Sequence, residues 1–503
     1  MYVRCKKNKS GSTSIQVIDK SRGLYRVVQT IGNSSNAARI EELIGEGEAW
    51  IKSRSNQLAI DFSGKRNTAI QFLDSIEHIH VAGTELLLGR LFDQIGFNSV
   101  DNELFRPLVL SRLTYPCSKL KTTDYLMRYH SLSCDVHQIY YSMDKLYHKH
   151  KDSIQRISYE HSLKVLSEKI TVLFYDVTTL YFESDDEDEL RKRGFSKDGK
   201  AQHIQIVLGL LVSLDGYPLA YQIFEGNKFE GHTMLPVITS FKKKYGIENT
   251  PIVVADSGLL SQANIDELTQ KRYEFILGAR LRNMDKTAEE AVLSLTLQNG
   301  QSQVIHKDDL RLIVSYSDAR AAKDKANRER GLRKLEKRIR SGKLTKDNIN
   351  NRGYNKYLKL EGEMAVSIDM EKFVLDAKWD GLKGYLTNSK LNKTEVISNY
   401  KQLWKIEKAF RVSKHDLQIR PIFHRLDRRI EMHVCISFAA YKVYKELERQ
   451  LGLKGSKLSP EKAIEIAQTI YSVKVRIPQS KDSVEKVIIL TEEQKMLAGL
   501  FNF

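Results

Sequence analysis

Residues 171–182 read TVLFYDVTTLYF, and this run of β-branched and aromatic residues around one aspartate decides the fold of the chain. Such residues favour a buried strand, and an aspartate among them is costly to bury unless it is paired or binds a metal. Two more strands are expected at HIQIVLGLLVS (203–213) and YPLAYQIFEG (217–226), joined by the tight-turn sequence LDGY. The run therefore predicts the first strand of an antiparallel trio.

The segments that follow the trio alternate between helical and strand patterns. HTMLPVITSFKKKYG (232–246) and SQANIDELTQKRY (261–273) have helical spacing, whereas PIVVADSG (251–258) and EFILGAR (274–280) are short apolar runs typical of buried strands. An antiparallel trio followed by such units builds a mixed sheet. The order predicts the α/β fold class, with a mixed sheet of the RNase H-like type.

The rest of the chain is arranged around this core. Short apolar alternations and then a helical stretch precede it. A very basic stretch with a second group of strands interrupts it, and helical patterns return after residue 393. We expect six segments: a small β-rich module at 1–60, a helical DNA-binding pre-domain at 61–170, the first part of the core at 171–281, an inserted, partly β domain with a basic helix at 282–390, the second part of the core at 391–450, and a C-terminal segment at 451–503.

Bulk composition bounds the kind of protein. The chain has 503 residues, more than one hydrophobic core usually supports. Its net charge of +17 favours nucleic acid as a partner, although ribosome-associated, membrane-surface and merely basic proteins share that property. The four cysteines are scattered, with no CxxC pair. No bilayer-spanning run or secretory leader is evident, so no membrane association and a cytoplasmic location are expected.

Three acidic residues are the candidates for catalysis. Asp176 and Asp256 end strands that are neighbours in an RNase H-like sheet, so their carboxylates should meet and need a divalent cation. Glu407 lies in NYKQLWKIEKAFRVSK, where Leu403, Ile406 and Phe410 predict an apolar helix face beside it. An all-oxygen set suits Mg²⁺ better than any His or Cys arrangement in the chain.

These motifs resemble a known family. The strand FYDVTTLYFE, the strand VVADSGL and the spacing of Tyr400, Leu403, Glu407 and Lys414 are similar to the DDE transposases of bacterial insertion sequences, in the branch with a tyrosine, arginine, glutamate, lysine signature. The resemblance covers roughly residues 100–450. Leu403 stands where that signature has arginine, so which cation contacts the substrate phosphate near Glu407 stays open.

The resemblance implies a reaction and its partners. The expected chemistry is phosphoryl transfer at the ends of a mobile DNA element, with two Mg²⁺ ions (Mn²⁺ substituting) about 3.5 to 4 Å apart that activate water and then a 3′-hydroxyl. The expected partners are double-stranded DNA, as terminal inverted repeats and target, and a second copy of the chain on DNA; the protein would be nucleoid-associated when bound. The expected DNA-contacting residues are Tyr400, Lys405, Arg411, Lys414, Arg328, Arg333 and Lys337.

The basic helix expected at 320–343 carries eleven Lys or Arg against three acids and would follow a DNA backbone without reading sequence. Basic residues on the helical pre-domain, Arg112, Lys119, Lys121 and Arg128, could also face phosphates, but a solvated face explains them as well.

Plainer interpretations compete for several positions. A lone aspartate after a strand is usually a turn or N-cap residue, and the acidic run 185–189 is typical of a solvated loop. Structural roles are favoured for His203 and His232, which have no serine or cysteine to activate. Core packing is favoured for Trp404 over base stacking. Asn227 and Glu230 either approach the site or cap the next helix.

Two other functions remain open at this point: an RNase H-like nuclease that cuts but never joins DNA, and a non-catalytic DNA-binding protein derived from such an enzyme. A strand-transfer assay separates the first from a transposase, and Asp176→Ala separates the second.

Overall fold

The computed structural model describes residues 1–20, 23–54, 72–166, 170–184, 186–196, 202–247, 251–342, 344–350, 353–361, 365–477 and 482–503. The predicted segment boundary at residue 60, Asp185 of the acidic run and residue 343 at the end of the basic stretch lie outside the described residues. The chain divides into two compact units, Met1–His78 with Val473–Glu485, and Ile79–Ser472 with Lys486–Phe503. The six finer segments stay a prediction.

The N-terminal end is a small antiparallel meander with one helix. Strands β1 (Tyr2–Lys7), β2 (Thr13–Asp19) and β3 (Arg26–Ser34) pair in that order, as the alternating apolar pattern predicts. Helix α1 (Ala37–Arg54) follows, and the strand-based prediction for this segment did not include it. Another three-stranded sheet has the order β16 (Ser483–Ile488), β15 (Tyr471–Arg476) and β4 (Ile76–Val81).

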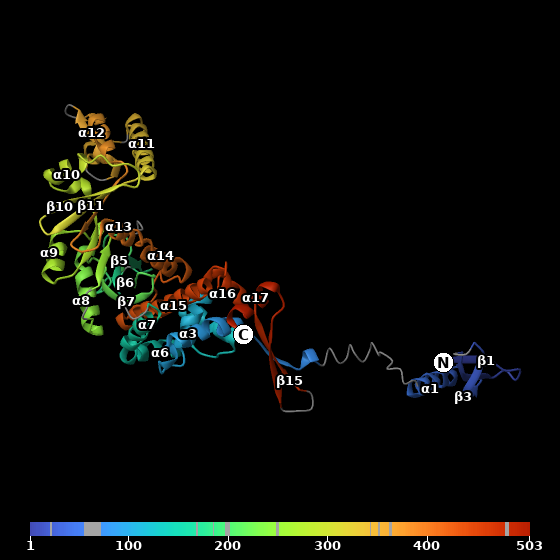
Figure 1. The fold of residues 1–503 in the computed structure, drawn as a ribbon. Helices are drawn as coiled ribbons and strands as arrows, with labels where there is room; N and C mark the ends of the chain where they lie inside the picture. The colour runs from blue at the N-terminus through green and yellow to red at the C-terminus, as the bar shows by residue number, and fades with distance from the viewer. Residues whose placement is uncertain are drawn as a thin grey trace. The chain divides into compact units, whose positions relative to one another are not determined.

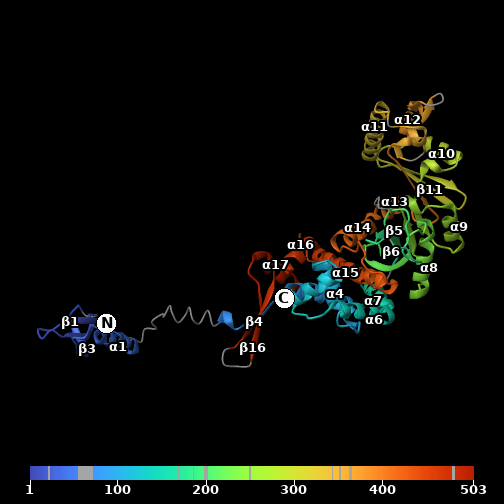
Figure 2. The ribbon, with the colours of Figure 1, turned by 180° about the vertical axis from the view of Figure 1, so that it is seen from behind.

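A helical region precedes the main sheet, as the sequence predicts. Its helices are α3 (Arg90–Ile95), α4 (Phe105–Thr114), α5 (Lys119–His130), α6 (Val136–Lys149) and α7 (Lys151–Val165). The long helix α15 (Asp427–Leu453), from far along the chain, packs against α4 and α6 (Figure 2). The C-terminal end adds α16 (Pro460–Ala467) and α17 (Glu492–Phe501).

The main sheet has eight strands in the order β10-β11-β14-β9-β8-β5-β6-β7. Strands β5 (Val172–Tyr181), β6 (Gln205–Ser213) and β7 (Pro218–Glu225) form the predicted antiparallel trio. After α8 (Met234–Tyr245), β8 (Ile252–Ala255) pairs parallel to β5; after α9 (Gln262–Gln270), β9 (Phe275–Ala279) pairs parallel to β8. The predicted mixed α/β fold is confirmed.

Of the second group of strands, expected around residues 373–388, only β14 forms, and it extends this sheet; residues 373–379 are helical instead. Strands β10 (Ser302–Lys307), β11 (Leu310–Tyr316) and β14 (Leu382–Thr387) follow α10 (Lys286–Leu293), and β14 pairs antiparallel with β9. What stands apart is α11 (Asp318–Arg340), the hairpin β12 (Leu358–Glu361) and β13 (Ala365–Ile368), and α12 (Met370–Leu375). These pack on a small core that includes Leu335 and Tyr357.

Helices cover both faces of the sheet, and the alternation along β5 shows which residues meet which helices. Phe174 and Leu180 belong to a core shared with α13 (Lys393–Lys401), α14 (Trp404–Arg411) and α15, whereas Leu173, Tyr175 and Val177 belong to a core shared with α8 and α9 (Figure 1). Since side chains alternate along a strand, Asp176 lies on the face that α13 to α15 cover. None of the helices in the described part of the chain has the length and apolarity of a membrane span.

Candidate active site

Two predicted aspartates are brought side by side by the pairing of β5 with β8. The parallel register ends at Tyr175 opposite Ala255. Asp176 is the residue after Tyr175, and Asp256 is the residue after Ala255. Neighbouring strands lie about 4.8 Å apart, so the two carboxylates start from adjacent backbone positions. Val254 belongs to the same core as Phe174, so both aspartates continue the rows that face α13 to α15.

Asp176 lies within its strand, whereas the sequence predicted it at the strand's end. Strand β5 continues to Tyr181 because it stays paired with β6, where Asp176 is opposite Leu210. The side chain is half-buried between Tyr175 and Val177, and its Oδ1 accepts the Val177 N–H at 2.8 Å. The pairing of β5 with β8, by contrast, ends just before Asp176.

Asp256 occupies the N-cap position of the short 3₁₀-helix Ser257–Leu259, yet its side chain makes no capping hydrogen bond. Its Oδ1 instead accepts a hydrogen bond from the Tyr400 hydroxyl at 3.0 Å. That hydroxyl passes over Gly278, where a Cβ would lie 2.3 Å from it and 2.9 Å from the Ser257 nitrogen. Burial, and then Asp256, raise the pKa of Tyr400, so the phenol stays a hydrogen-bond donor. Asp256 is thus an N-cap residue by position, as the plainer interpretation expected, but its side chain bonds Tyr400 and not the helix.

The segment that carries Glu407 is two helices, whereas the predicted spacing assumed one. Helix α13 ends at Lys401 and α14 begins at Trp404, so Tyr400 and Glu407 lie on different helices. The predicted apolar face is confirmed, since Leu403, Ile406 and Phe410 are buried in the core. Trp404 is 51% exposed, so the interpretation of this side chain as core packing is wrong.

Glu407 is exposed on α14, a helix that contacts β5. Glu407 and Asp256 both act electrostatically on Tyr400 and on Lys383, so the three acidic residues share one neighbourhood. Among the described residues, however, no group of three or more His, Cys, Asp or Glu is gathered closely enough to hold a metal ion. The structure thus joins the two aspartates and leaves Glu407 turned to solvent beside them. The donor set consists of carboxylate oxygens, which fits a hard divalent cation.

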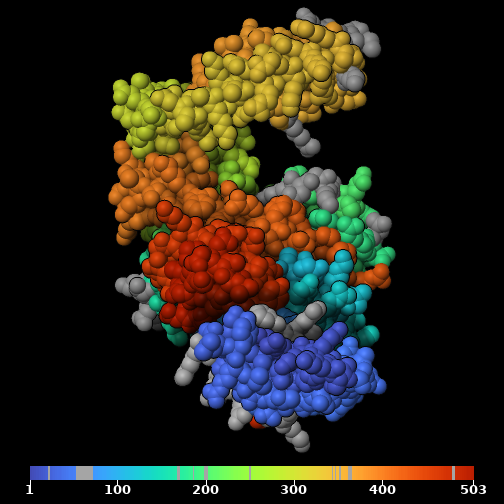
Figure 3. Space-filling view, turned by 90° about the vertical axis from the view of Figure 1, so that its right-hand side faces the viewer, coloured from blue at the N-terminus to red at the C-terminus, as the bar shows by residue number. Residues whose placement is uncertain are grey.

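A cavity of about 920 Å³ opens from Asp256 and Tyr400 toward α11 and the loop before β14. In the space-filling view a hollow separates the yellow segment of α11 from the orange segment of α13 and α14 (Figure 3). Six cationic side chains line the cavity: Arg280, Arg282, Arg320, Arg328, Lys356 and Lys383. Four of them pair with acids: Arg328 with Asp380, Arg282 and Lys356 with Asp376, and Arg320 with Asp324.

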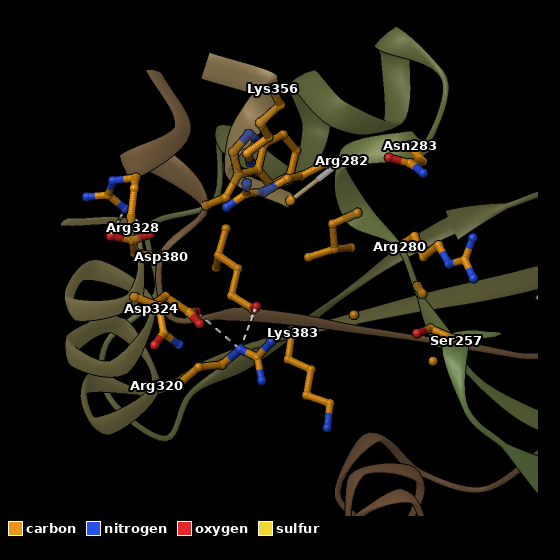
Figure 4. A pocket seen from close by; sticks show the side chains of 18 of the residues that line it. Ser257, Arg280, Arg282, Asn283, Arg320, Asp324, Arg328, Lys356, Asp380 and Lys383 are labelled. Carbon is orange, nitrogen blue, oxygen red and sulfur yellow. Dashed lines mark hydrogen bonds and ion pairs between the residues drawn. The ribbon is translucent and has the colours of Figure 1, made fainter. Parts of the chain in front are cut away.

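Of the six cations, the sequence predicted only Arg328 by name as a DNA contact, although Arg320 begins the expected basic helix. Arg320 donates to the Leu382 carbonyl at 3.2 Å and lies 3.5 Å from Asp324, as Figure 4 shows. Arg280 and Lys383 make no ion pair with a described residue. The Lys383 Nζ lies 4.5 Å from the centroid of the Tyr400 ring, and burial lowers its pKa. A lysine between apolar residues in GLKGYLT was the available sequence signal for it.

Glu230 also approaches the aspartates. Its Oε2 lies 3.9 Å from where a Gly258 Cβ would be, two residues past Asp256. Burial raises the pKa of Tyr175, and the nearby charges of Asp176 and Glu230 add to that rise. Asn227 is exposed, and α8 begins with Thr233 as its N-cap. Of the two alternatives weighed for Glu230, proximity to the site is the one that the geometry supports.

The candidate site lies within a region that is similar to a known protein family. A family model described as "Transposase DDE domain" matches residues 167–442, more than half of the chain and all three acidic residues. The chain belongs to this transposase family. It therefore acts in DNA transposition, and its family uses divalent metal ions for cutting and transferring DNA. No curated protein matches the chain.

One solved structure is also similar to this DDE transposase. It is the piggyBac transposase synaptic complex with hairpin DNA, 10% identical, covering 80% of this chain and 79% of that chain, with a TM-score of 0.39. At that TM-score the likeness is too weak to bear on the fold or the function of this chain.

The predicted DNA-contacting residues of the transposase have different surroundings. Lys405 is committed to the β6–β7 hairpin, since its Nζ donates to the Leu214 carbonyl at 2.7 Å. Arg328 pairs with Asp380 and lies over the Phe373 ring, and it also lines the cavity. Arg333 and Lys337 are exposed on α11, Arg411 is exposed on α14, and Lys414 is half-buried. His203 and His232 contact Tyr181 and Phe229 by their rings, in line with structural roles.

Proposed function

We propose that this chain cleaves DNA strands at the ends of an insertion sequence and joins them to target DNA, with Asp176, Asp256 and Glu407 as its metal-binding carboxylates. The single observation that carries the proposal is the β5–β8 register, which sets Asp176 beside Asp256 on the face covered by the helix of Glu407. The cationic cavity that begins at Asp256 supports it, because a DNA strand needs positive charge next to the reacting phosphate.

The three carboxylates would hold two Mg²⁺ ions, with Mn²⁺ able to replace them. Asp176, Asp256 and Glu407 would be their protein ligands; Glu407 is exposed and would have to approach the two aspartates to take part. Bound divalent ions supply an activated water or 3′-hydroxyl and neutralise charge that develops on the phosphate. Tyr400 fixes the orientation of Asp256 by its hydrogen bond, which leaves the second oxygen of that carboxylate for a ligand.

The finer assignment within the family is also a proposal. Tyr400, Glu407 and Lys414 have the spacing of the branch with the tyrosine, arginine, glutamate, lysine signature, and Leu403 takes the arginine's place. Its substrates would be terminal inverted repeats and target DNA, handled by a homodimer formed on DNA at the bacterial nucleoid. The helical region 61–170 and the exposed face of α11 with Arg333 and Lys337 would contribute phosphate contacts.

The test uses DNA ends taken from the inverted repeats that flank the coding region. Asp176→Asn, Asp256→Asn and Glu407→Gln should each abolish nicking, and also strand transfer from a pre-cut 3′ end, in Mg²⁺. DNA binding measured in EDTA should persist, since phosphate contacts do not need the metal. Asp215→Asn in the exposed β6–β7 turn is the matched control and should remain active. Nicking without strand transfer by the wild type would identify a nuclease, and full activity of Asp176→Asn would refute the carboxylate assignment.

A further inference from the structure

Four basic side chains are buried together away from the cavity at Asp256. Arg112 comes from α4, Lys119 is the first residue of α5, His424 lies in the segment before α15, and His433 lies in α15. Arg112 is 4% exposed and Lys119 is 6% exposed, and both histidines are similarly buried. Neither the fold nor the proposed reaction accounts for cations in this position.

Contacts within the cluster determine which ring nitrogens of its histidines carry a proton. The His433 Nε2 lies 2.8 Å from the Ile419 carbonyl and donates to it, so Nδ1 accepts from the Arg112 guanidinium at 3.5 Å. Burial, and then Arg112 and Lys119, hold the pKa of His433 well below its usual range. The His424 ring lies 5.4 Å from the His433 ring, and burial lowers its pKa to about 3. Both imidazoles are therefore neutral at physiological pH, so the cations of the cluster are Arg112 and Lys119. Burial lowers the pKa of Arg112 to about 10 and holds that of Lys119 well below its usual range, so the charged form of the lysine needs an anion beside it.

Within the described part of the chain neither cation has a carboxylate partner; the acidic group that acts on both is the Cys117 thiol. Arg112 donates to the Leu417 carbonyl at 3.4 Å and makes no ion pair, and Lys119 has no carboxylate among its electrostatic neighbours. Asp144, which lies beyond Tyr140 from His424, is already paired with Arg428 and Arg429. Burying a cation without a counterion destabilises a protein, and natural proteins keep such groups where they bind a ligand.

The surroundings of the cluster suit a phosphate. Lys119 opens the twelve-residue helix α5, whose N-terminus carries the positive end of the helix dipole. The Lys121 N–H donates to the Ser118 side chain, so the Lys119 and Leu120 N–H groups are the ones left for an anion. The cluster lies directly beneath the surface, since Lys119 is followed by exposed Leu120 and Lys121, and His424 is flanked by exposed Phe423 and Arg425. Exposed cations and aromatic groups around a buried cationic site are typical of a nucleic-acid interface.

We propose that Arg112, Lys119 and the N-terminus of α5 form a binding site for one phosphate of the DNA backbone. The neutral His433 orients the Arg112 guanidinium, and the desolvated setting makes a phosphate contact stronger than one on the protein surface. The inference rests on the proposed function only in taking DNA as the source of the anion. It assigns the helical region a contact that lies apart from the metal-binding carboxylates.

Lys119→Met tests the site, with Lys243→Met, at an exposed position on α8, as the control. Binding of a labelled duplex is measured by anisotropy in EDTA between about 50 and 200 mM salt, so that the result does not depend on catalysis. Lys119→Met should weaken binding about tenfold or more and reduce the slope of log K against log salt by about 0.9. Its Tm should equal or exceed that of the wild type, because an uncompensated buried charge is removed. Lys243→Met should change affinity far less.

A second measurement decides the case if Lys119→Met fails to fold. Inorganic phosphate should raise the Tm of the wild-type chain more than chloride does at equal ionic strength, and Lys119→Arg should keep that effect. The proposal is overturned if Lys119→Met binds DNA as tightly as the wild type, or if phosphate protects no better than chloride. Protection by phosphate together with unchanged DNA affinity of Lys119→Met would assign the site to free phosphate and refute DNA as its ligand. Loss of cleavage in the triad variants leaves all of these outcomes unaffected.

Discussion

Lys383 connects the two halves of the candidate active site. It comes from β14, its ammonium lies against the Tyr400 ring, and Tyr400 in turn holds Asp256. Lys405, a nearby candidate for the cation that would contact the phosphate, is tied to the β6–β7 hairpin instead. The geometry therefore favours Lys383 for a role that the sequence left open between Lys405 and Arg411.

Lys383→Gln should lower DNA cleavage about tenfold or more without lowering the Tm, because the lysine faces the cavity and satisfies no buried carboxylate. Single-turnover cleavage rates in saturating Mg²⁺ measure the effect. Lys378→Gln is the control, since Lys378 is exposed in the neighbouring turn. Equal rates for Lys383→Gln and the wild type would remove this residue from the site.

Helix α11 is fixed to the sheet through the loop that precedes β14. The Ser317 N–H donates to the Gly381 carbonyl, and the Gly381 N–H donates to Asp324 at 3.2 Å. Arg328 and Asp380 form an ion pair in which both side chains are about nine-tenths buried. These contacts hold one wall of the cavity, so the basic helix is a structural part of the site as well as a charged surface.

Asp380→Asn should therefore destabilise the chain by about 3 kcal/mol, because it leaves the buried Arg328 guanidinium without its counterion. Denaturant unfolding measures the change, and limited proteolysis should show earlier cutting near α11. Arg333→Gln, on the exposed side of the same helix, should change the free energy of unfolding by no more than about 0.5 kcal/mol. If the two variants are equally stable, the Arg328–Asp380 pair is not what holds the helix.

The two compact units bury separate apolar groups. The N-terminal module buries Ile15, Val17, Ile18 and Leu43. None of these residues belongs to the two cores of the main sheet or to the small core at Leu335. A unit with its own core can fold without its neighbour.

Deleting residues 1–54 should accordingly leave the Tm of the remaining chain within about 2 °C of its value in the full-length protein, as scanning calorimetry would show. The deleted module should appear as a separate, smaller transition in the full-length protein. A drop of more than about 5 °C would mean that the sheet and its helices depend on the N-terminal module.

Local patterns predicted much of this fold correctly. The β-branched run around Asp176, the turn at Asp215 and the apolar run before Asp256 were enough for the strand order, because each strand's composition and its turns are local properties. Long-range pairing was not local: the sequence did not show that β14 pairs with β9, and so the second group of strands was expected as a separate body.

The amino-acid sequence by itself determined the residue types of the site, three carboxylates in an order that suits one sheet, and the strong positive charge that suits DNA. Tertiary structure alone decided which groups meet. It broke the predicted helix between Tyr400 and Glu407, turned Glu407 and Trp404 to solvent, and brought Lys383 to Tyr400. It also buried Arg112 with Lys119 without a carboxylate partner. The physical reason is that burial and pairing depend on segments far apart in the chain, whereas periodicity reports only on neighbours within a few residues.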